Sequence, residues 1–561
     1  MNFRKSLYQV SLVTIMAISA VNTQAQGVVP AQKGDKTFTL EDLNFGGNNY
    51  RNMVAKNRWC TWWGDQLVRQ DVDACYLVNK TNGKETKLFG INDINQWIAP
   101  TKDVKVRALY NARFPFAGKS IVMVSNGSKT YTVDFRKHRL ISELEFQEGE
   151  NLLEANTQQN AFAYLKGSNL YVRTFNAAPE NAMTKEKKSH DFQLSADGSR
   201  EIVYGQSVHR DEFGISKGTF WSPNGERLAF YRMDQSMVTD YPQVNIPEIG
   251  FDHPETQSCI ATPAPDKYPM AGETSHQVTV GVFDCLTGKT IYLKAGDPTD
   301  RYFTNIAWSP DSKTVYMFEV NRDQNDSRLT AYDAETGEKT GELYRETDEK
   351  YVEPLHPIMF LPWDSNRFIM QSRKDGYNHL YLCTLGKHGS RMASNTESLD
   401  IRQLTSGKWE VMEVLGFNRK RKSIIIASNE CSPIQRNIFL VDTQTGKRTM
   451  MDDCGKGWHN ATLSESGQFV YDNYSTPDVP RKIAIVNTEN GKRTAYFTAE
   501  NPWKGYNVPE YSCGTVKAAD GETDLYWRMV KPTNFDPAKK YPTIIYVYGG
   551  PHAHNVDARW N

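Results

Sequence analysis

A turn phrase that recurs about every 50 residues limits the folds open to this chain. Each copy has Asp or Asn, three further residues, a Gly and usually a Lys, and the copies are Asn79–Lys84, Asp284–Lys289, Asp333–Gly337, Asp442–Lys447 and Asn487–Lys492. The acidic or amide side chain can bond the backbone of the turn, and Gly accepts the positive φ that closes a hairpin. Neighbouring glycines lie 49 and 45 residues apart, and gaps of 109 and 205 residues fit two and four periods.

A second phrase, Trp-Ser-Pro, marks the same period. It occurs at 221–225 and 308–311, in front of the apolar stretches 227–231 and 314–318, and 463–467 is a degraded third copy. Short strands and hairpins at this period are typical of a propeller blade with four antiparallel strands. We therefore predict a mainly β fold, with a β-propeller of about eight blades over residues 41–505. A β-sandwich is the alternative, but sandwiches seldom extend over some four hundred residues as one unit.

The pattern changes near residue 505. Residues 524–530 read as a strand, 531–540 as a loop containing Pro, and 543–548 (Thr-Ile-Ile-Tyr-Val-Tyr) as a continuously apolar strand. An apolar run of that kind suits the buried sheet of an α/β domain. We predict that residues 506–561 begin an α/β-hydrolase domain that is incomplete at Asn561.

The first 25 residues have the features of a signal peptide. Arg4 and Lys5 precede an apolar run at 7–21, and the small residues Thr23 and Ala25 favour cleavage after Ala25. A membrane anchor is the alternative, but the run is shorter than the roughly 20 residues of a spanning helix, and no later segment is apolar enough to span. We expect a periplasmic or extracellular protein in which residues 26–40 form an N-terminal segment.

Charge and cysteine content exclude several classes of function. Lys+Arg and Asp+Glu both total 66, so no basic field indicates a nucleic-acid partner. The eight cysteines contain no CxxC pair, and His552 and His554 lack an obvious third ligand, so we expect neither a metal nor another cofactor. Cys60 and Cys75 are close enough in sequence for a disulfide, although two buried thiols are an equal alternative.

Several motifs together resemble a known family. They are the signal peptide, the Trp-Ser-Pro turns, YPMAG at 268–272, SRKDGYNHLY at 372–381 and YVYGGP at 546–551. This combination resembles the dipeptidyl peptidase IV branch of the prolyl oligopeptidase family, and within it the bacterial prolyl tripeptidyl peptidases. The resemblance implies an eight-bladed propeller above an α/β-hydrolase domain, and cleavage after proline near a free peptide N-terminus by a Ser-Asp-His triad.

The nucleophile motif of such enzymes does not follow the predicted hydrolase strands. Hydrolase folds present the serine of GxSxG on a turn between a strand and a helix, and the match at 214–218 lies within the predicted propeller, before those strands. We expect the triad downstream of Asn561, so that this chain alone is inactive; the resemblance also implies that the complete protein can form a homodimer. The rival hypothesis is a non-catalytic periplasmic propeller that binds protein partners. The predicted hydrolase strands after residue 523 favour the enzyme.

Tyr548 is the first candidate site residue. It matches the family's tyrosine whose phenol donates to the oxyanion of the tetrahedral intermediate, and such a donor typically lowers the barrier by about 3 kcal/mol. Without the resemblance, Tyr-Gly-Gly-Pro would indicate only a strand followed by a tight turn.

Glu212 and Asp211 are candidates for binding the substrate's α-ammonium. In the dipeptidyl peptidases the matching position holds consecutive glutamates, and a buried cation requires such partners. Here Arg210 and Asp211 precede Glu212, and this single Glu in EFGI resembles the tripeptidyl peptidases more closely. Asp211 could act as a second carboxylate, or Arg210 could neutralise it and leave Glu212 alone. Release of dipeptides or of tripeptides therefore remains open.

Overall fold

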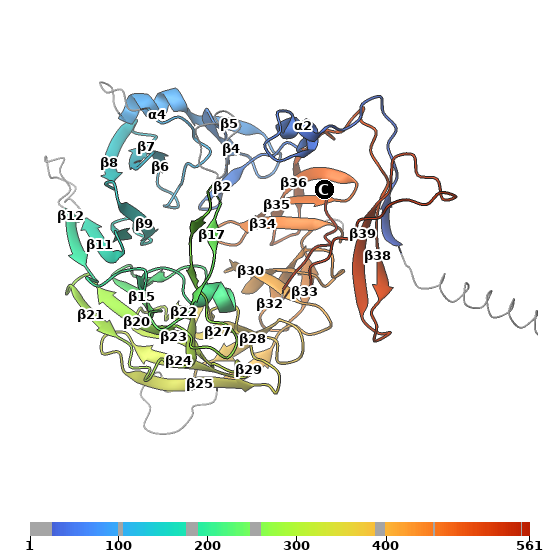
Figure 1. Ribbon diagram of the computed structural model, residues 1–561. Helices are drawn as coiled ribbons and strands as arrows, with labels where there is room; N and C mark the ends of the chain where they lie inside the picture. The colour runs from blue at the N-terminus through green and yellow to red at the C-terminus, as the bar shows by residue number, and fades with distance from the viewer. Residues whose placement is uncertain are drawn as a thin grey trace, which may run out of the picture. The chain divides into compact units, whose positions relative to one another are not determined.

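The computed structural model describes residues 25–98, 105–175, 189–246, 260–386, 399–452, 455–550 and 552–560 (Figure 1). The chain divides into two compact units, and the segments of the two units alternate along the sequence. The first unit comprises Met1–Val124, Val133–Arg139 and Lys408–Asn561, and the second comprises Ser125–Thr132 and Leu140–Gly407.

The first unit contains three four-stranded antiparallel sheets whose strands pair in chain order. They are β2 (Cys60–Trp63), β3 (Gln66–Gln70), β4 (Ala74–Val78) and β5 (Glu85–Gly90); β30 (Val411–Asn418), β31 (Ser423–Ser428), β32 (Asn437–Asp442) and β33 (Arg448–Met450); and β34 (Trp458–Leu463), β35 (Phe469–Thr476), β36 (Val479–Asn487) and β37 (Arg493–Thr498). A separate sheet has the order β1 (Ala25–Val29), β38 (Tyr511–Lys517) and β39 (Asp524–Val530). The helices are α2 (Leu40–Leu43), α3 (Tyr50–Met53) and α4 (Ile91–Ile98).

The second unit contains three further four-stranded sheets and one of five strands. The four-stranded sheets are β9 (Glu150–Ala155), β10 (Ala161–Lys166), β11 (Asn169–Phe175) and β12 (Ser189–Gln193); β22 (Arg301–Trp308), β23 (Thr314–Asn321), β24 (Asp326–Asp333) and β25 (Lys339–Thr347); and β26 (Met359–Leu361), β27 (Asp364–Ser372), β28 (His379–Thr384) and β29 (Asp400–Gln403).

The five-stranded sheet carries the elements that later form the candidate site. It consists of β13 (Ile202–Tyr204), β14 (Thr219–Trp221), β15 (Arg227–Asp234), β20 (Gln277–Asp284) and β21 (Lys289–Tyr292), with the 3₁₀ segment η1 (His209–Gly214) between β13 and β14. An inserted ribbon between β15 and β20 is built from β16 (Asp240–Tyr241) paired with β19 (Asp266–Lys267), and β17 (Val244–Asn245) paired with β18 (Thr262–Pro263).

One more sheet, β6 (Ile121–Asn126), β7 (Lys129–Asp134) and β8 (Arg139–Glu145), lies where the division between the units crosses the chain. From β2 to β37, eight sheets therefore succeed one another along the described chain, and six of them are four-stranded meanders. This is the strand order of an eight-bladed β-propeller. This strand order confirms the predicted mainly β propeller fold and argues against the β-sandwich alternative.

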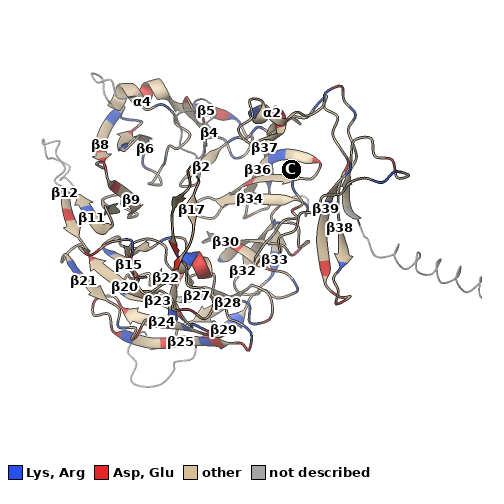
Figure 2. Ribbon diagram, in the orientation of Figure 1, with Lys and Arg blue, Asp and Glu red and all other residues tan. Residues whose placement is uncertain are grey.

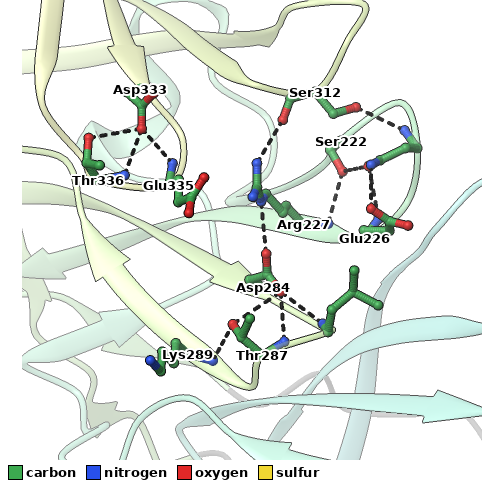
Figure 3. Close-up of polar contacts among 12 residues, drawn as sticks. Ser222, Glu226, Arg227, Asp284, Thr287, Lys289, Ser312, Asp333, Glu335 and Thr336 are labelled. Carbon is green, nitrogen blue, oxygen red and sulfur yellow. Dashed lines mark hydrogen bonds and ion pairs between the residues drawn. The ribbon is translucent and has the colours of Figure 1, made fainter.

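The predicted hairpin turns form as their residues indicate (Figure 3). The Asp284 carboxylate accepts the backbone N–H groups of Leu286 and Thr287, both at 2.9 Å, and Asp333 binds its own turn in the same way. The five glycines that close these turns have φ between 68° and 74°, a region that costs glycine little. In the Trp-Ser-Pro turns the serine hydroxyl accepts the N–H five residues later, at 3.0 Å for Ser222, 2.9 Å for Ser309 and 3.1 Å for Ser464.

Arg227 joins neighbouring blades of the second unit (Figure 3). Its Nε donates to Asp284 Oδ2 at 3.0 Å within its own sheet, and its Nη1 donates to the Ser312 carbonyl oxygen of the next blade at 3.3 Å. The apolar core continues across the same junction, where buried residues from β15 and β20 pack with Phe303, Val315 and other residues of β22–β24. The repeated turns thus connect blades as well as closing hairpins.

Within the first unit, the first blade packs against the last. Leu67 and Val78 share a buried cluster with Tyr471, Ile483 and Ile485. Polar contacts border this cluster, among them Tyr496 Oη donating to Glu85 Oε1 at 2.6 Å. The contact joins segments about 400 residues apart and makes the first and last blades neighbours.

Residues 543–548 differ from the prediction of a buried strand. The structure assigns no strand there, and the side chains of Ile544, Ile545 and Val547 are 97%, 80% and 79% exposed. A buried strand needs partners on its edges and cover on its faces, and no described segment pairs with this one. The other two predictions in this region are correct: residues 524–530 form β39, and 531–540 are a loop.

Strand β1 begins at Ala25, the residue of the predicted cleavage site, and pairs with β38. Residues 1–24 lie outside the described residues, so the signal peptide stays a prediction, as do the domain boundaries. Across the described ranges, no helix is long and apolar enough to cross a membrane. Basic and acidic residues are interspersed along the ribbon (Figure 2), as the equal totals predict.

Cys60 and Cys75 are thiols, which decides between the two alternatives. The two residues lie on β2 and β4, with β3 between them. Burial is the main cause that raises the pKa of each thiol to about 12, so neither is reactive in the folded protein.

Candidate functional site

Three consecutive residues before Glu212 have left-handed backbone conformations. Within η1, φ is 52° at His209, 55° at Arg210 and 64° at Asp211, while Glu212 returns to −56°. A left-handed conformation costs a residue with a Cβ about 1–2 kcal/mol, so contacts around the turn must compensate. Such strain is concentrated at functional sites in proteins, which makes η1 a candidate.

Two aromatic contacts hold the ends of the turn. His209 and Phe213 are both 2% exposed, and their rings lie 4.8 Å and 5.0 Å, centroid to centroid, from the ring of Tyr302 on β22. Phe213 also packs on Val320 of β23. The turn is therefore fixed against the neighbouring blade of the same unit.

The side chains of Arg210 and Asp211 point to different partners. Arg210 forms an ion pair with Asp266 on β19, and its guanidinium lies 4.2 Å from the centroid of the Tyr268 ring. Asp211 accepts a hydrogen bond from the Ser207 hydroxyl. Arg210 thus pairs with Asp266 and not with Asp211, which was one of the alternatives drawn from the sequence.

Glu212 lines an open cavity of about 1070 Å³ in the second unit. Its carboxylate forms no hydrogen bond or ion pair with any described residue, in contrast to Asp211, which does not line the cavity. The remaining lining residues are His209, Arg210, Tyr268, Pro269, Ala271, Gly272, Glu273, Ser275, His276, Asp300, Tyr302, Asn321, Arg322, Asp323, Gln324, Lys350 and Tyr351. The cavity is large enough for a short peptide.

Charges of both signs surround the cavity. Arg322 donates from Nη1 to the Tyr302 hydroxyl and from Nη2 to the Glu273 carbonyl oxygen at 3.2 Å. Neither Arg322 nor Lys350 forms an ion pair within the part of the chain that the structure describes. Polar donors therefore lie in the same cavity as the Glu212 carboxylate, as a peptide with an ammonium group and carbonyl oxygens would require.

Two buried histidines lie behind the turn. Burial lowers the pKa of His209 to about 3 and that of His276 to about 4, and nearby positive charge contributes to both shifts. Both ring nitrogens of His209 lack a hydrogen-bond partner among the described residues. Both side chains are therefore neutral at neutral pH and add no positive charge next to Glu212.

Tyr548 lies in the other unit, and its side chain is 64% exposed. Its hydroxyl makes no hydrogen bond to a described residue, and it lies close enough to Gly550 that a Cβ added there would meet it at 2.8 Å. The predicted oxyanion role is neither supported nor opposed by these contacts, so it stays a prediction.

Both ring nitrogens of His554 contact oxygen atoms of the protein. Its Nε2 contacts the Pro433 carbonyl oxygen at 3.0 Å, and its Nδ1 contacts Asp557. The Asp557 contact is the main cause that raises the pKa of His554. No group of three potential metal-ligating side chains occurs among the described residues.

Sequence reasoning missed most of the residues around Glu212. Tyr268 belongs to the YPMAG motif, which carried the resemblance without receiving a role. Arg322 and its neighbours form the turn between β23 and β24, where a cluster of Asn, Arg, Asp and Gln residues was the available signal. Asp266 carried no signal at all.

Comparison with known proteins assigns the family. The sequence profile described as the dipeptidyl peptidase IV (DPP IV) N-terminal region matches residues 117–481, well over half of the chain. The chain belongs to the dipeptidyl peptidase IV family. This DPP IV family member is 44% identical to a crystallised Bacteroides ovatus protein assigned as a dipeptidyl aminopeptidase IV, with a TM-score of 0.82 over 94% of this chain and 71% of that one.

More distant relatives agree with this assignment. A probable dipeptidyl-aminopeptidase B of Emericella nidulans is 25% identical over 86% of this chain, and one of Phaeosphaeria nodorum is 25% identical over 79%. The chain spans about half the length of these two relatives, 56% and 50%. The structure of Porphyromonas gingivalis dipeptidyl peptidase 4 shares the fold, with a TM-score of 0.70 at 20% identity over 94% of this chain and 72% of that one.

Proposed function

We propose that this DPP IV family member recognises peptides by their free N-terminus, and that the complete protein is a serine exopeptidase. The Glu212 carboxylate would bind the substrate's α-ammonium inside the cavity. The observation that carries this assignment is the unpaired carboxylate of Glu212, held toward the cavity on a strained turn. The names of the relatives agree with peptidase activity.

The chemistry of the cavity supports an exopeptidase. A charge-assisted hydrogen bond to a carboxylate is about twice as strong as a neutral one, so a peptide without a free ammonium would bind weakly at Glu212. A carboxylate at a fixed distance from the nucleophile selects the residue after which the chain is cut. Of the two carboxylates predicted from the sequence, Asp211 is bonded to Ser207, so we assign the ammonium to Glu212.

The finer parts of the proposal rest on the resemblance. We propose cleavage after proline at the second or third residue, Tyr548 as an oxyanion donor, and a Ser-Asp-His triad in sequence beyond residue 561. Export to the periplasm or cell surface and a homodimer of the complete protein belong to the same proposal.

Binding of matched peptides tests the ammonium site directly on this chain. We expect Ala-Ala-Pro amide to bind more tightly than its N-acetylated form in titration calorimetry. Glu212→Gln should weaken binding of the free amine about 100-fold, because it leaves the ammonium unpaired, and should leave the acetylated peptide unchanged. Glu273→Gln, which changes another cavity carboxylate, is the matched control. Equal losses in both variants would refute the assignment to Glu212.

Hydrolysis by the complete protein tests the reaction and the product length. Chromogenic Xaa-Pro and Xaa-Xaa-Pro substrates separate release of dipeptides from release of tripeptides. Tyr548→Phe should lower kcat by about 100-fold with little change in KM, because an oxyanion donor acts in the transition state. A complete protein that hydrolyses neither substrate would contradict the enzyme and favour a propeller that only binds.

A further inference from the structure

Arg210 lies two residues before Glu212 and connects η1 to the inserted ribbon. Its guanidinium pairs with Asp266 on β19 and stacks on Tyr268, two residues farther along. The side chains of Arg210 and Asp266 are 37% and 41% exposed, so substitutions there leave the core intact. The ion pair also reduces the repulsion that an unpaired guanidinium would exert on an ammonium in the cavity.

The residues that precede and follow Asp266 in sequence both form hydrogen bonds that hold this part of the ribbon. The Pro265 carbonyl oxygen accepts a hydrogen bond from Arg200 Nη2 at 2.8 Å, and Lys267 Nζ donates to the Val238 carbonyl oxygen at 2.8 Å. Arg200 also pairs with Asp240 on β16, the strand opposite β19. The ribbon therefore presents Asp266 to Arg210 from a position fixed to the same sheet.

The other contacts that hold the turn do not involve the Glu212 side chain, so its direction depends on the link made by Arg210. His209 and Phe213 fix the two ends on Tyr302, and Asp211 is bonded to Ser207 within the segment. Among the side chains of η1, Arg210 is the one bonded to the ribbon. Because its own φ is 55°, the turn can relax toward a right-handed conformation if this side chain is released.

We propose that Arg210 is a positioning residue that directs Glu212 into the cavity through its link to Asp266 and Tyr268. The inference rests on the proposed function, since it concerns the same ammonium site. It makes the affinity for a free N-terminus depend on the ribbon, whose Asp266 does not itself line the cavity.

The test compares two peptides across matched variants of this chain. Wild-type protein, Arg210→Gln, Arg210→Lys and Asp266→Asn are titrated with Ala-Ala-Pro amide and with its N-acetylated form. We expect Arg210→Gln and Asp266→Asn to weaken binding of the free amine about tenfold and leave the acetylated peptide unchanged, since neighbours in one network are coupled. Arg210→Lys, which keeps the charge, should recover most of the loss.

Arg345→Gln is the matched control, because Arg345 forms a bidentate pair with Asp326 away from the cavity, at 2.9 Å and 2.8 Å. It should leave both affinities at the wild-type value. Suppose that wild-type protein prefers the free amine. If the Arg210→Gln and Asp266→Asn variants then keep the full preference, the positioning role is wrong while the proposed function stands. If wild-type protein binds both peptides equally, the ammonium site itself is wrong, and the positioning role with it.

Discussion

Asp65 accepts two hydrogen bonds from Ser466, one from the backbone N–H at 3.0 Å and one from the hydroxyl at 2.8 Å, across 401 residues of sequence. Burial alone would raise the pKa of Asp65, but the bonds from Ser466 outweigh it and hold the pKa below its usual value. The ionised carboxylate therefore belongs to the contact between the first and last blades.

Asp65→Ala should lower the free energy of unfolding by about 1.5–3 kcal/mol, the range for hydrogen bonds to a charged group. Urea denaturation followed by tryptophan fluorescence measures the change. Asp348→Ala, which removes a carboxylate that caps a turn in the second unit, is a control that leaves the contact between first and last blades in place. An Asp65→Ala midpoint equal to that of wild-type protein would show that the contact adds no stability.

Alanine substitutions at two turn glycines distinguish the stability cost of a positive φ from that of a steric clash. Gly467 and Gly491 have similar φ values of 76° and 72°, but a Cβ at Gly467 would lie 2.0 Å from the Phe417 carbonyl oxygen, whereas one at Gly491 has no neighbour within 4 Å. Gly491→Ala should cost about 1–2 kcal/mol of stability through φ alone. Gly467→Ala should cost more, because the backbone of two blades must move apart. Equal shifts in thermal unfolding would contradict the clash.

The buried histidines predict a loss of stability in acid. The pKa of His209 is about 3 in the folded protein and about 6.5 when unfolded, so the unfolded state takes up a proton first as the pH falls. The stabilisation is complete above pH 6.5 and is lost progressively toward pH 3. His209→Leu should make the decline of unfolding free energy below pH 6.5 shallower by up to about 1.4 kcal/mol per pH unit.

The slope of unfolding free energy against pH in the wild-type protein is the reference for that comparison. A His209→Leu protein with the wild-type slope would mean that His209 takes up its proton without unfolding.

Thiol labelling checks the cysteines. Cys60 and Cys75 should resist iodoacetamide in the folded protein and be alkylated in guanidinium without any reductant, because both are thiols whose pKa is raised to about 12 by the fold. Cys431, which is exposed, should be alkylated in the folded protein. Peptide mapping distinguishes the three sites, and a Cys60–Cys75 linked peptide would contradict the structure.

The blades could be predicted because their signal is local. Asp284 and Gly288 define a turn within five residues, and the spacing between such turns reveals the period without any knowledge of packing. Residues 543–548 show the opposite case. Their apolar side chains predicted burial, but burial depends on partner strands, which a single run of residues does not specify.

The site was predictable only in part, for the same reason. Resemblance and charge drew attention to Glu212, but they could not separate it from Asp211, whose partner Ser207 becomes apparent only in the folded turn. The pair of Arg210 with Asp266 joins residues 56 positions apart on different elements, with no motif linking them. Left-handed backbone at four residues of η1 that are not glycine is likewise set by tertiary contacts.

The packing of the first blade on the last has a consequence for biosynthesis. Leu67 and Val78 leave the ribosome about 400 residues ahead of Tyr471 and Ile483, which will cover them. At about 5–20 residues per second, that apolar surface waits on the order of 20–80 s for its partner. A nascent chain of this kind gains from a chaperone that shields its first blade until the last has been synthesised.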